Sequence, residues 1–186
     1  GTYYVRLKET ETTKAGEAQK VTVEDGPAIL TGTVTISGSA KYNETLTATV
    51  TDTNNSGTLK YQWKRDGVAI GGGTSAQYQL GQLDIGKTIS CEVTSTKELK
   101  SITGTMSGKV EKADNPVVPS GLIGTAATQK GASDGKIIGT TTAMEYATKA
   151  DFTDAKVVTS TEITDLKAGT YYVRLKETET TKAGEA

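Results

Sequence analysis

The sequence predicts an all-β protein made of two antiparallel β-sandwich domains, and three observations lead to that prediction. Short runs in which apolar and polar residues alternate recur along the chain, as in strands that bury one face. Asn, Asp and Gly separate these runs at intervals of roughly eight to twelve residues, which is typical of an antiparallel sandwich. Only 34% of the 186 residues are hydrophobic, yet Thr, Val and Ile are abundant. This composition suits thin domains in which alternate strand residues face the core.

One stretch, GTYYVRLKETETTKAGEA, occurs twice without a change, as residues 1–18 and 169–186. The two copies begin 168 residues apart, a period far longer than a solenoid repeat and equal in size to one or two ordinary domains. We therefore interpret the chain as one full period, plus an overlap, of a tandem array of nearly identical units. The residue at position 1 is Gly rather than Met, which fits a segment of a longer polypeptide.

Residues 1–25 are expected to form the closing hairpin of a domain that belongs to the preceding repeat. A strand, a polar turn and a second strand follow one another, and apolar residues occupy alternate positions in both strands. These positions are Tyr3, Val5, Leu7, Val21 and Val23.

Residues 26–113 are expected to form the first complete domain, because Gly26 and Pro27 break the preceding strand and a new series of strands follows. Turns at NNSG, DG and GQLDIG separate its strands. Three sets of inward-facing positions are predicted: Leu46, Ala48 and Val50; Leu59, Tyr61 and Trp63; and Ile89, Cys91 and Val93.

This domain resembles the immunoglobulin fold. Trp63 lies in mid-strand, and the run from Leu83 to Cys91 is similar to the L-x-D-x-G-x-Y-x-C corner of that superfamily. The segment YQWKRDG is similar to bacterial Ig-like modules. Two departures stand out: Ile89 replaces the corner Tyr, and no second Cys exists to pair with Cys91. The resemblance therefore implies an Ig-like sandwich without its disulfide.

Residues 114–186 are expected to form a second sandwich after a linker that contains Pro116 and Pro119. Leu166, Gly169, Thr170 and Tyr171 resemble the L-x-P-G-T-x-Y corner of fibronectin type III domains, with Ala168 in place of Pro and one residue fewer before the Tyr. Another seven-stranded sandwich is the alternative. The segment AGTYYVR also resembles repeat modules of bacterial cell-surface proteins.

The second domain stops before its last strand, because the second copy ends at Ala186 and the equivalent of residues 19–25 does not follow. An unpaired sheet edge needs a partner strand. We expect the next repeat, or residues 1–25 of another chain by strand addition, to supply it. The residues assigned to this completion are Tyr3, Val5, Leu7, Val21, Val23, Tyr171, Val173 and Leu175; Trp63, Cys91 and Leu166 mark the cores.

Catalysis and cofactor binding are not expected. The chain has no His, so Cys91 has no usual base to activate it and is interpreted as a core residue. Asp52, Asn54 and Ser56 match the start of a calcium loop, but Trp63 stands where the bidentate Glu belongs, and a plain hairpin turn explains the run. Glu177 and Glu179 are interpreted as residues of a solvated loop.

Partners are constrained by charge and by hydropathy. A net charge of −1 gives no footprint for nucleic acid or an anionic membrane, and no apolar run is long enough to span a bilayer. Isopeptide bonds occur in some bacterial surface sandwiches, and Lys41 or Lys60 with Asn115 is a conceivable pair. The outward-facing Tyr4 and Tyr172 could stack on a sugar or simply form a surface pair.

The leading functional hypothesis is a non-catalytic repeat of a long extracellular filament, stalk or bacterial cell-surface fibre, whose partners are neighbouring copies of the same repeat. A spacer gains length from every identical copy, whereas a binding site needs to occur only once. The alternative is a multivalent adhesin, in which each repeat holds a glycan or a host protein weakly and strength comes from avidity.

Overall fold

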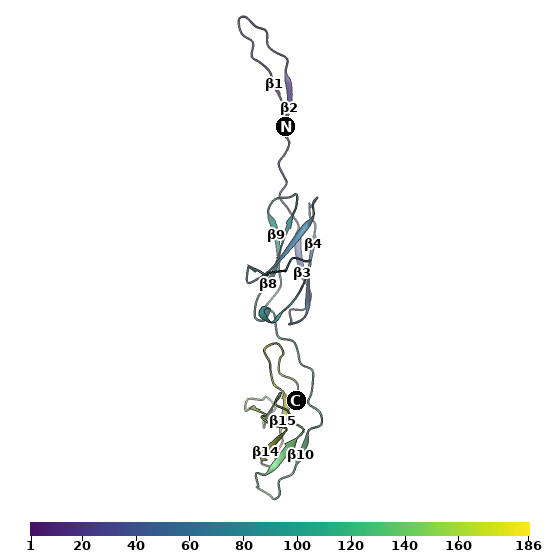
Figure 1. Cartoon of the computed structure of the whole chain (residues 1–186), viewed down its shortest axis with the longest axis vertical. Coiled ribbons are helices and arrows are strands. Elements are labelled where there is room, and N and C mark those ends of the chain that lie inside the picture. The colour runs from purple at the N-terminus through teal and green to yellow at the C-terminus, as the bar shows by residue number, and fades with distance from the viewer.

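The computed structural model describes all 186 residues and is all-β, with one 3-10 turn, Gln82–Asp84, as its only helical element. Figure 1 shows an elongated molecule in which a hairpin, an extended linker and two compact units follow one another along the long axis. All named strand pairs are antiparallel, as predicted. No helix has the length and the apolar character needed to cross a membrane.

The N-terminal hairpin consists of β1 (Thr2–Val5) and β2 (Gln19–Thr22), which pair only with each other. Tyr3 lies opposite Val21, and every residue of both strands is exposed. The linker that follows is also exposed, and the backbone of residues 24–27 makes no hydrogen bond. The hairpin is thus joined to the rest of the molecule through covalent bonds alone.

The central unit contains two antiparallel sheets, of three and four strands, in the orders β3-β4-β7 and β6-β5-β8-β9. Its core has ten buried residues. The strands are β3 (Thr33–Ser37), β4 (Thr45–Thr51), β5 (Leu59–Arg65), β6 (Val68–Ala69), β7 (Gln77–Gln79), β8 (Ile89–Ser95) and β9 (Ser101–Thr105).

Trp63 is at the centre of this core. It lies opposite Cys91 in the β5–β8 ladder, and both side chains are fully buried. The indole ring stacks on Tyr78 with ring centroids 5.6 Å apart, and Nε1 donates a hydrogen bond to the Ser75 carbonyl at 2.8 Å. The one polar atom of the indole therefore has a partner, which a buried Trp requires.

A buried carboxylate braces the corner where no disulfide is present. Asp84 is fully buried and accepts hydrogen bonds from Arg65 Nε at 2.7 Å, from the Tyr78 hydroxyl at 2.8 Å and from the Gly81 N–H at 2.7 Å. Burial, together with the Asp84 carboxylate, raises the pKa of Tyr78 to about 12. This network links the corner to β5 and β7.

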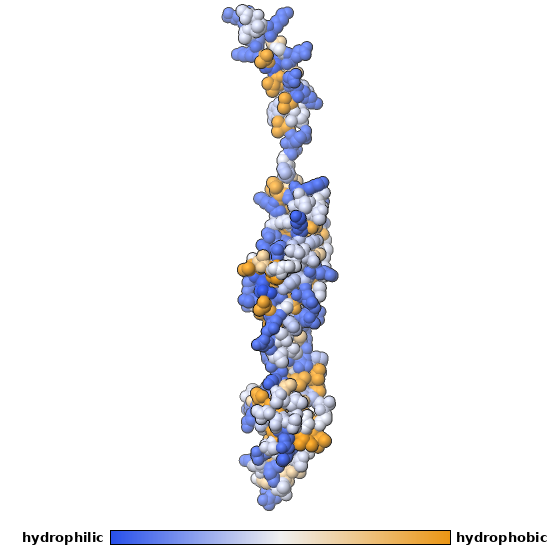
Figure 2. All heavy atoms as spheres, viewed as in Figure 1, coloured by the Kyte–Doolittle hydropathy of each residue, from blue (hydrophilic) through white to orange (hydrophobic).

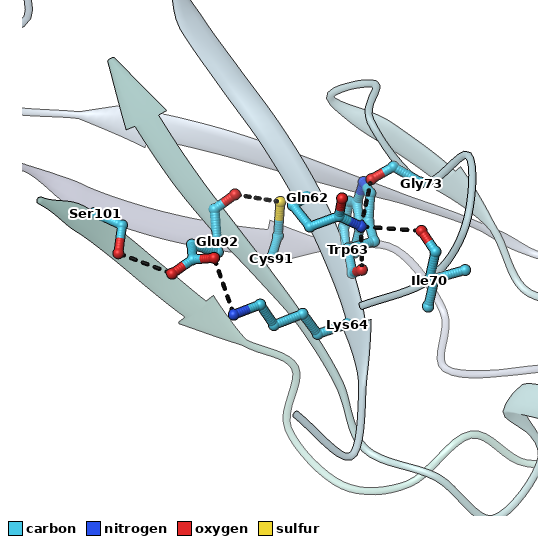
Figure 3. Close-up of polar contacts among 8 residues, drawn as sticks. All are labelled: Gln62, Trp63, Lys64, Ile70, Gly73, Cys91, Glu92 and Ser101. Carbon is cyan, nitrogen blue, oxygen red and sulfur yellow. Dashed lines mark hydrogen bonds and ion pairs between the residues drawn. The ribbon is translucent and has the colours of Figure 1, made fainter. Parts of the chain in front are cut away.

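Figure 3 shows how the side chain of Gln62 holds the glycine-rich connection between β6 and β7. Its Nε2 donates to the carbonyls of Trp63 at 2.8 Å and Ile70 at 2.9 Å, and the Trp63 N–H donates to the Gly73 carbonyl at 2.8 Å. A Cβ on Gly73 would lie only 3.1 Å from the Trp63 Cβ. Gly73 is therefore needed for close approach to the core, rather than for loop flexibility alone.

The C-terminal unit contains two sheets of three strands, in the orders β10-β11-β14 and β13-β12-β15. Its core is smaller, with five buried residues. The strands are β10 (Ile123–Thr125), β11 (Gly135–Ile138), β12 (Met144–Ala147), β13 (Lys156–Val157), β14 (Glu162–Leu166) and β15 (Tyr172–Leu175).

Strand β12 is short, ending at Ala147. Asp154 accepts hydrogen bonds from the N–H groups of Thr148 and Lys149, and Phe152 adopts a positive φ of 55°. These features turn the chain after Ala147, where β12 ends. Phe152 is nevertheless buried, under the Arg174 guanidinium 3.9 Å from its ring centroid.

Candidate functional site

The two copies of the duplicated segment share local hydrogen bonds, although β1 covers residues 2–5 and β15 covers the equivalents of residues 4–7. The Gly16 N–H donates to the Leu7 carbonyl at 3.3 Å, and the equivalent Gly184 N–H donates to the Leu175 carbonyl at 2.9 Å. The turn is also the same, because Thr10 N–H binds the Thr13 carbonyl just as Thr178 N–H binds the Thr181 carbonyl. The amino-acid sequence alone is therefore enough to specify this hairpin turn.

The surroundings of the two copies differ completely. Val5 is 61% exposed, whereas the equivalent Val173 is 9% exposed and belongs to the core of the C-terminal unit. Tyr3 and Leu7 are exposed, whereas Tyr171 and Leu175 are half-buried against that core. The face that the first copy presents to solvent is thus the face that the second copy packs inward.

Tyr171 anchors the start of β15. Its hydroxyl donates a hydrogen bond to the Lys167 carbonyl at 2.9 Å, four residues upstream, and its ring lies 6.4 Å from that of Tyr146. Leu166, at the end of the preceding strand, is buried. A Tyr that bonds back to the backbone at such a corner is a feature of several β-sandwich families.

β15 is an edge strand with one unpaired side. The Lys176 N–H donates to the Ala143 carbonyl at 2.9 Å, so the backbone of Lys176 faces β12. Because successive residues of a strand direct their backbone groups to opposite sides, Tyr171, Val173 and Leu175 direct theirs away from β12. The Gly184 bond to Leu175 lies on that side, but no strand pairs with Tyr171 or Val173 there.

A cavity of about 700 Å³ opens beside this unpaired edge. Its walls come from the β10–β11 region and from the segment that leads into β15. In Figure 2 apolar residues gather on the C-terminal unit and along the N-terminal hairpin. The larger apolar residues of the lining are Leu122, Ile137, Leu166, Tyr171 and Val173, and Lys130, Lys136 and Lys167 also line the cavity.

The turn of the second copy is docked against the central unit. Thr181 forms a parallel bridge with Ala113, and Lys112 Nζ lies 2.5 Å from Glu177 Oε1. Lys182 Nζ lies 2.6 Å from Glu111 Oε2 and 3.2 Å from Asp114 Oδ1. Gln82 donates to Glu179, and Lys41 pairs with Asp114. We call this set of contacts the joint.

The joint combines ion pairs with two backbone hydrogen bonds, from the Ala113 N–H to the Thr180 carbonyl and from the Lys182 N–H to the Ala113 carbonyl, each at 2.8 Å. Lys112 holds the pKa of Glu177 below its usual range, and Lys182 does the same for Glu111. Hydrogen bonds from Lys41 and Lys182 lower the pKa of Asp114. All these side chains are partly exposed, so each pair contributes little by itself and is screened by salt.

The sequence did not reveal the joint. Glu177 and Glu179 remain exposed, as a solvated loop implies, but their partners lie on another unit of the fold. The available signal was the pairing of basic and acidic residues in EKAD (residues 111–114) with those in ETETTK (residues 177–182). Lys41, considered for a covalent link to Asn115, pairs with the neighbouring Asp114 instead.

The candidate metal residues do not converge. Asn54 Oδ1 accepts from the Thr31 N–H at 2.8 Å and its Nδ2 donates to the Ile29 carbonyl at 2.8 Å. Ser56 donates to Glu98 Oε1 at 2.6 Å, and Asp52 is exposed with a φ of 50°. These side chains fasten one end of the central unit, and no group of three or more metal-binding side chains occurs in the structure.

The single thiol and Trp63 offer little to a ligand. Burial raises the pKa of Cys91, and Trp63 is fully buried, so it has no surface on which a sugar could stack. Tyr4 is exposed and its equivalent Tyr172 is half-buried. No protein-family model matches the chain, and a search of curated proteins found no match either.

Proposed function

We propose that this chain is a structural, non-catalytic repeat of a long extracellular filament, stalk or cell-surface fibre. In this proposal the central unit is an Ig-like domain of residues 26–113, and the C-terminal unit is a fibronectin type III-like domain of residues 114–186. The hairpin of residues 1–25 belongs to the preceding copy of the second domain, and neighbouring copies of the repeat are the partners.

The observation that carries the proposal is the exact duplication, with one copy at one end of the elongated molecule and the other copy in the unit at the opposite end (Figure 1). The turn of residues 8–14 points away from the central unit, whereas the turn of residues 176–182 contacts that unit from the opposite end (Figure 1). Both turns therefore point the same way along the long axis. Identical elements that repeat head to tail generate an open linear array when the rotation between successive copies does not close into a ring.

The placement of charge and of apolar residues suits this role. Each period supplies one joint, between the central and C-terminal units, and one exposed linker without hydrogen bonds. The buried residues serve the two cores, the Asp84 brace and the attachments at the unit ends. A fibre needs length, solubility and load-bearing strands, and it needs no site that occurs once.

The first test is the mass of the native material under denaturing conditions. We expect a species, or a ladder, at multiples of the 168-residue period between Gly1 and Gly169. Such a ladder means that many copies are joined in one polypeptide. A single band at the mass of one 186-residue chain would overturn the covalent array.

A further inference from the structure

We infer that the cavity beside β15 is the receptor for residues 19–25 of the adjacent repeat, an inference that rests on the proposed repeat array. In this inference the segment QKVTVED adds as a strand to the unpaired side of β15 and inserts Val21 and Val23 into the cavity. The C-terminal unit then gains a fourth strand in the sheet β13-β12-β15.

The register follows from the hairpin that the chain already contains. β1 has the sequence of the corresponding part of the second copy, and it pairs with β2 so that Tyr3 faces Val21 and Val5 faces Gln19. The backbone groups of Gly1 and Val23 also exchange hydrogen bonds, at 3.0 and 2.9 Å. When the same register is applied to the second copy, Val21 of the adjacent repeat lies opposite Tyr171. Gln19 of that repeat lies opposite Val173, and its Val23 lies opposite Gly169.

The hydrogen bonds that this register requires are available. In the first copy the backbone of Tyr3 and Val5 is directed toward β2. In the second copy the equivalent backbone groups of Tyr171 and Val173 are directed to the unpaired side of β15. An unpaired strand edge is a template for another strand, and main-chain hydrogen bonds give such additions their affinity.

The side chains match the cavity as well. Residues directly opposite in an antiparallel pair lie on the same face, so Val21 and Val23 face the side on which Tyr171 and Val173 meet the core. Gly169 lines the cavity without a side chain and leaves room for Val23. Lys20, Thr22 and Glu24 then face solvent, which is where polar side chains of an edge strand belong.

The adjacent repeat is the favoured occupant because the chain already leads toward this edge. Residues 181–184 run from the joint to the Leu175 carbonyl, and in the first hairpin the equivalent Gly16 bond to Leu7 comes shortly before β2 begins at Gln19. In the first copy Gln19 follows Gly16 after two residues. In the proposed array the equivalent of Gln19 therefore follows Ala186 directly.

The test uses a cross-link across the predicted register. Lys20 of the added strand lies opposite Tyr172, as it lies opposite Tyr4 in the hairpin, and this pair faces solvent. A Tyr172→Cys chain is mixed with the peptide QKVTVED that carries Lys20→Cys, under mild oxidation. The Cα atoms of such a pair are about 4.5 Å apart, which permits a disulfide. Cys91 is buried and does not compete.

The matched control is the same peptide with Thr22→Cys in place of Lys20→Cys. Its thiol faces solvent too, but it lies diagonally from residue 172, about 7 to 8 Å away and outside the range of a disulfide. We expect cross-linking with the Lys20→Cys peptide to be at least about tenfold faster. Equal rates for the two peptides would overturn the register.

Two further variants test whether the cavity receives the valines. A Lys20→Cys peptide that also carries Val21→Lys and Val23→Lys should lose the rate advantage, because Lys130, Lys136 and Lys167 line the cavity and no carboxylate of its lining could pair with the added charges. The second variant, Ala126→Trp, adds a large side chain at an exposed position of the cavity wall. It should weaken the binding of a fluorescently labelled QKVTVED peptide at least about tenfold, because the indole occupies the space that the two valines need. Undiminished binding in both cases would overturn the inference.

These outcomes are separable from the fate of the proposed function. If the native material forms the expected ladder but the peptides do not bind in register, the array stands and the receptor is wrong. If the peptides bind in register but the native material is a single short chain, the receptor stands, and separate chains associate through the hairpin.

Discussion

Residues 1–18 and 169–186 are one sequence in two environments, and the contrast separates what a segment specifies by itself from what its neighbours supply. Both copies make the Gly-to-Leu hydrogen bond and the same Thr turn. Only the second copy has a buried Val, a bonded Tyr hydroxyl and ion pairs across a joint. Local hydrogen bonding is thus a property of the segment, whereas stability and assembly depend on the units around it.

The largest difference between the two copies is expected when a charge is placed at the equivalent Val positions. Val173→Asp puts a carboxylate in the core of the C-terminal unit, and we expect destabilisation by about 3 kcal/mol or more. Val5 is 61% exposed, so Val5→Asp should change the free energy of unfolding of the C-terminal unit by less than about 0.5 kcal/mol. Hydrogen exchange of the β12 and β15 amides measures both; equal effects would contradict the difference in burial.

A gentler comparison adds one methyl group. A Cβ at Gly184 would lie 2.9 Å from the Val117 carbonyl oxygen, whereas at Gly16 the nearest atom is the Leu7 Cβ at 3.4 Å. The entropic effect of Gly→Ala on the unfolded chain is shared by both sites. Gly184→Ala should therefore destabilise the C-terminal unit by about 1 to 3 kcal/mol more than Gly16→Ala in urea unfolding. A smaller difference would mean that the backbone of residues 115–119 shifts readily to make room for the added methyl group.

Removal of one hydroxyl sharpens the comparison further. Tyr171→Phe deletes the hydrogen bond to the Lys167 carbonyl, and we expect a loss of about 1 kcal/mol. Tyr3→Phe is the matched control, because no hydrogen bond of the Tyr3 side chain occurs in the structure, and it should leave thermal stability unchanged. If the two variants melt alike, the corner does not depend on that bond.

The smallest expected effect concerns the joint. Glu111, Asp114 and Glu177 have lowered pKa values, so their contribution is complete above the ordinary carboxylate range near pH 4 and is lost as the pH falls through the lowered values. We expect the units to move more freely at pH 2 to 3, and also in high salt at pH 7. Fluorescence energy transfer between labels on the two units measures this motion.

Paired substitutions identify the side chain responsible. Glu177→Gln should reduce the salt dependence of energy transfer, because the ion pair with Lys112 is lost. Glu9→Gln removes the equivalent carboxylate of the first copy and should have no effect. A joint that is insensitive to salt, to pH and to Glu177→Gln alike would have to be held by the Ala113–Thr181 bridge instead.

Sequence reasoning worked best where burial follows strand alternation. The all-β class and the antiparallel sheets are confirmed, and the positions around Leu46, Trp63 and Cys91 face the core as the period of two implies. The duplicated segment pointed to an unpaired strand edge, and the structure places β15 at the edge of its sheet. These features depend on patterns within a few residues or on identity between copies.

Reasoning from the sequence failed where partners are distant in the chain. Glu177 and Lys112 are 65 residues apart, and the complementary charges of their two segments do not by themselves show that the segments meet. The motif around Asn54 and Ser56 favours a plain turn, but it gives no sign of their partners Ile29, Thr31 and Glu98, which lie 23 to 42 residues away in the chain. The cavity beside β15 could not be predicted, because it lies between two sheets whose strands come together only in the folded unit.

The exposed linker at residues 24–27 has a consequence for the proposed fibre as a polymer. Within a period the charged joint couples two units, whereas between periods the chain has no hydrogen bond to resist rotation. One period then acts as the statistical segment of the whole polymer. Its contour length grows in proportion to the number of repeats, but its mean end-to-end distance grows only as the square root. Such a fibre would behave as an entropic spring and extend under weak force before any domain unfolds.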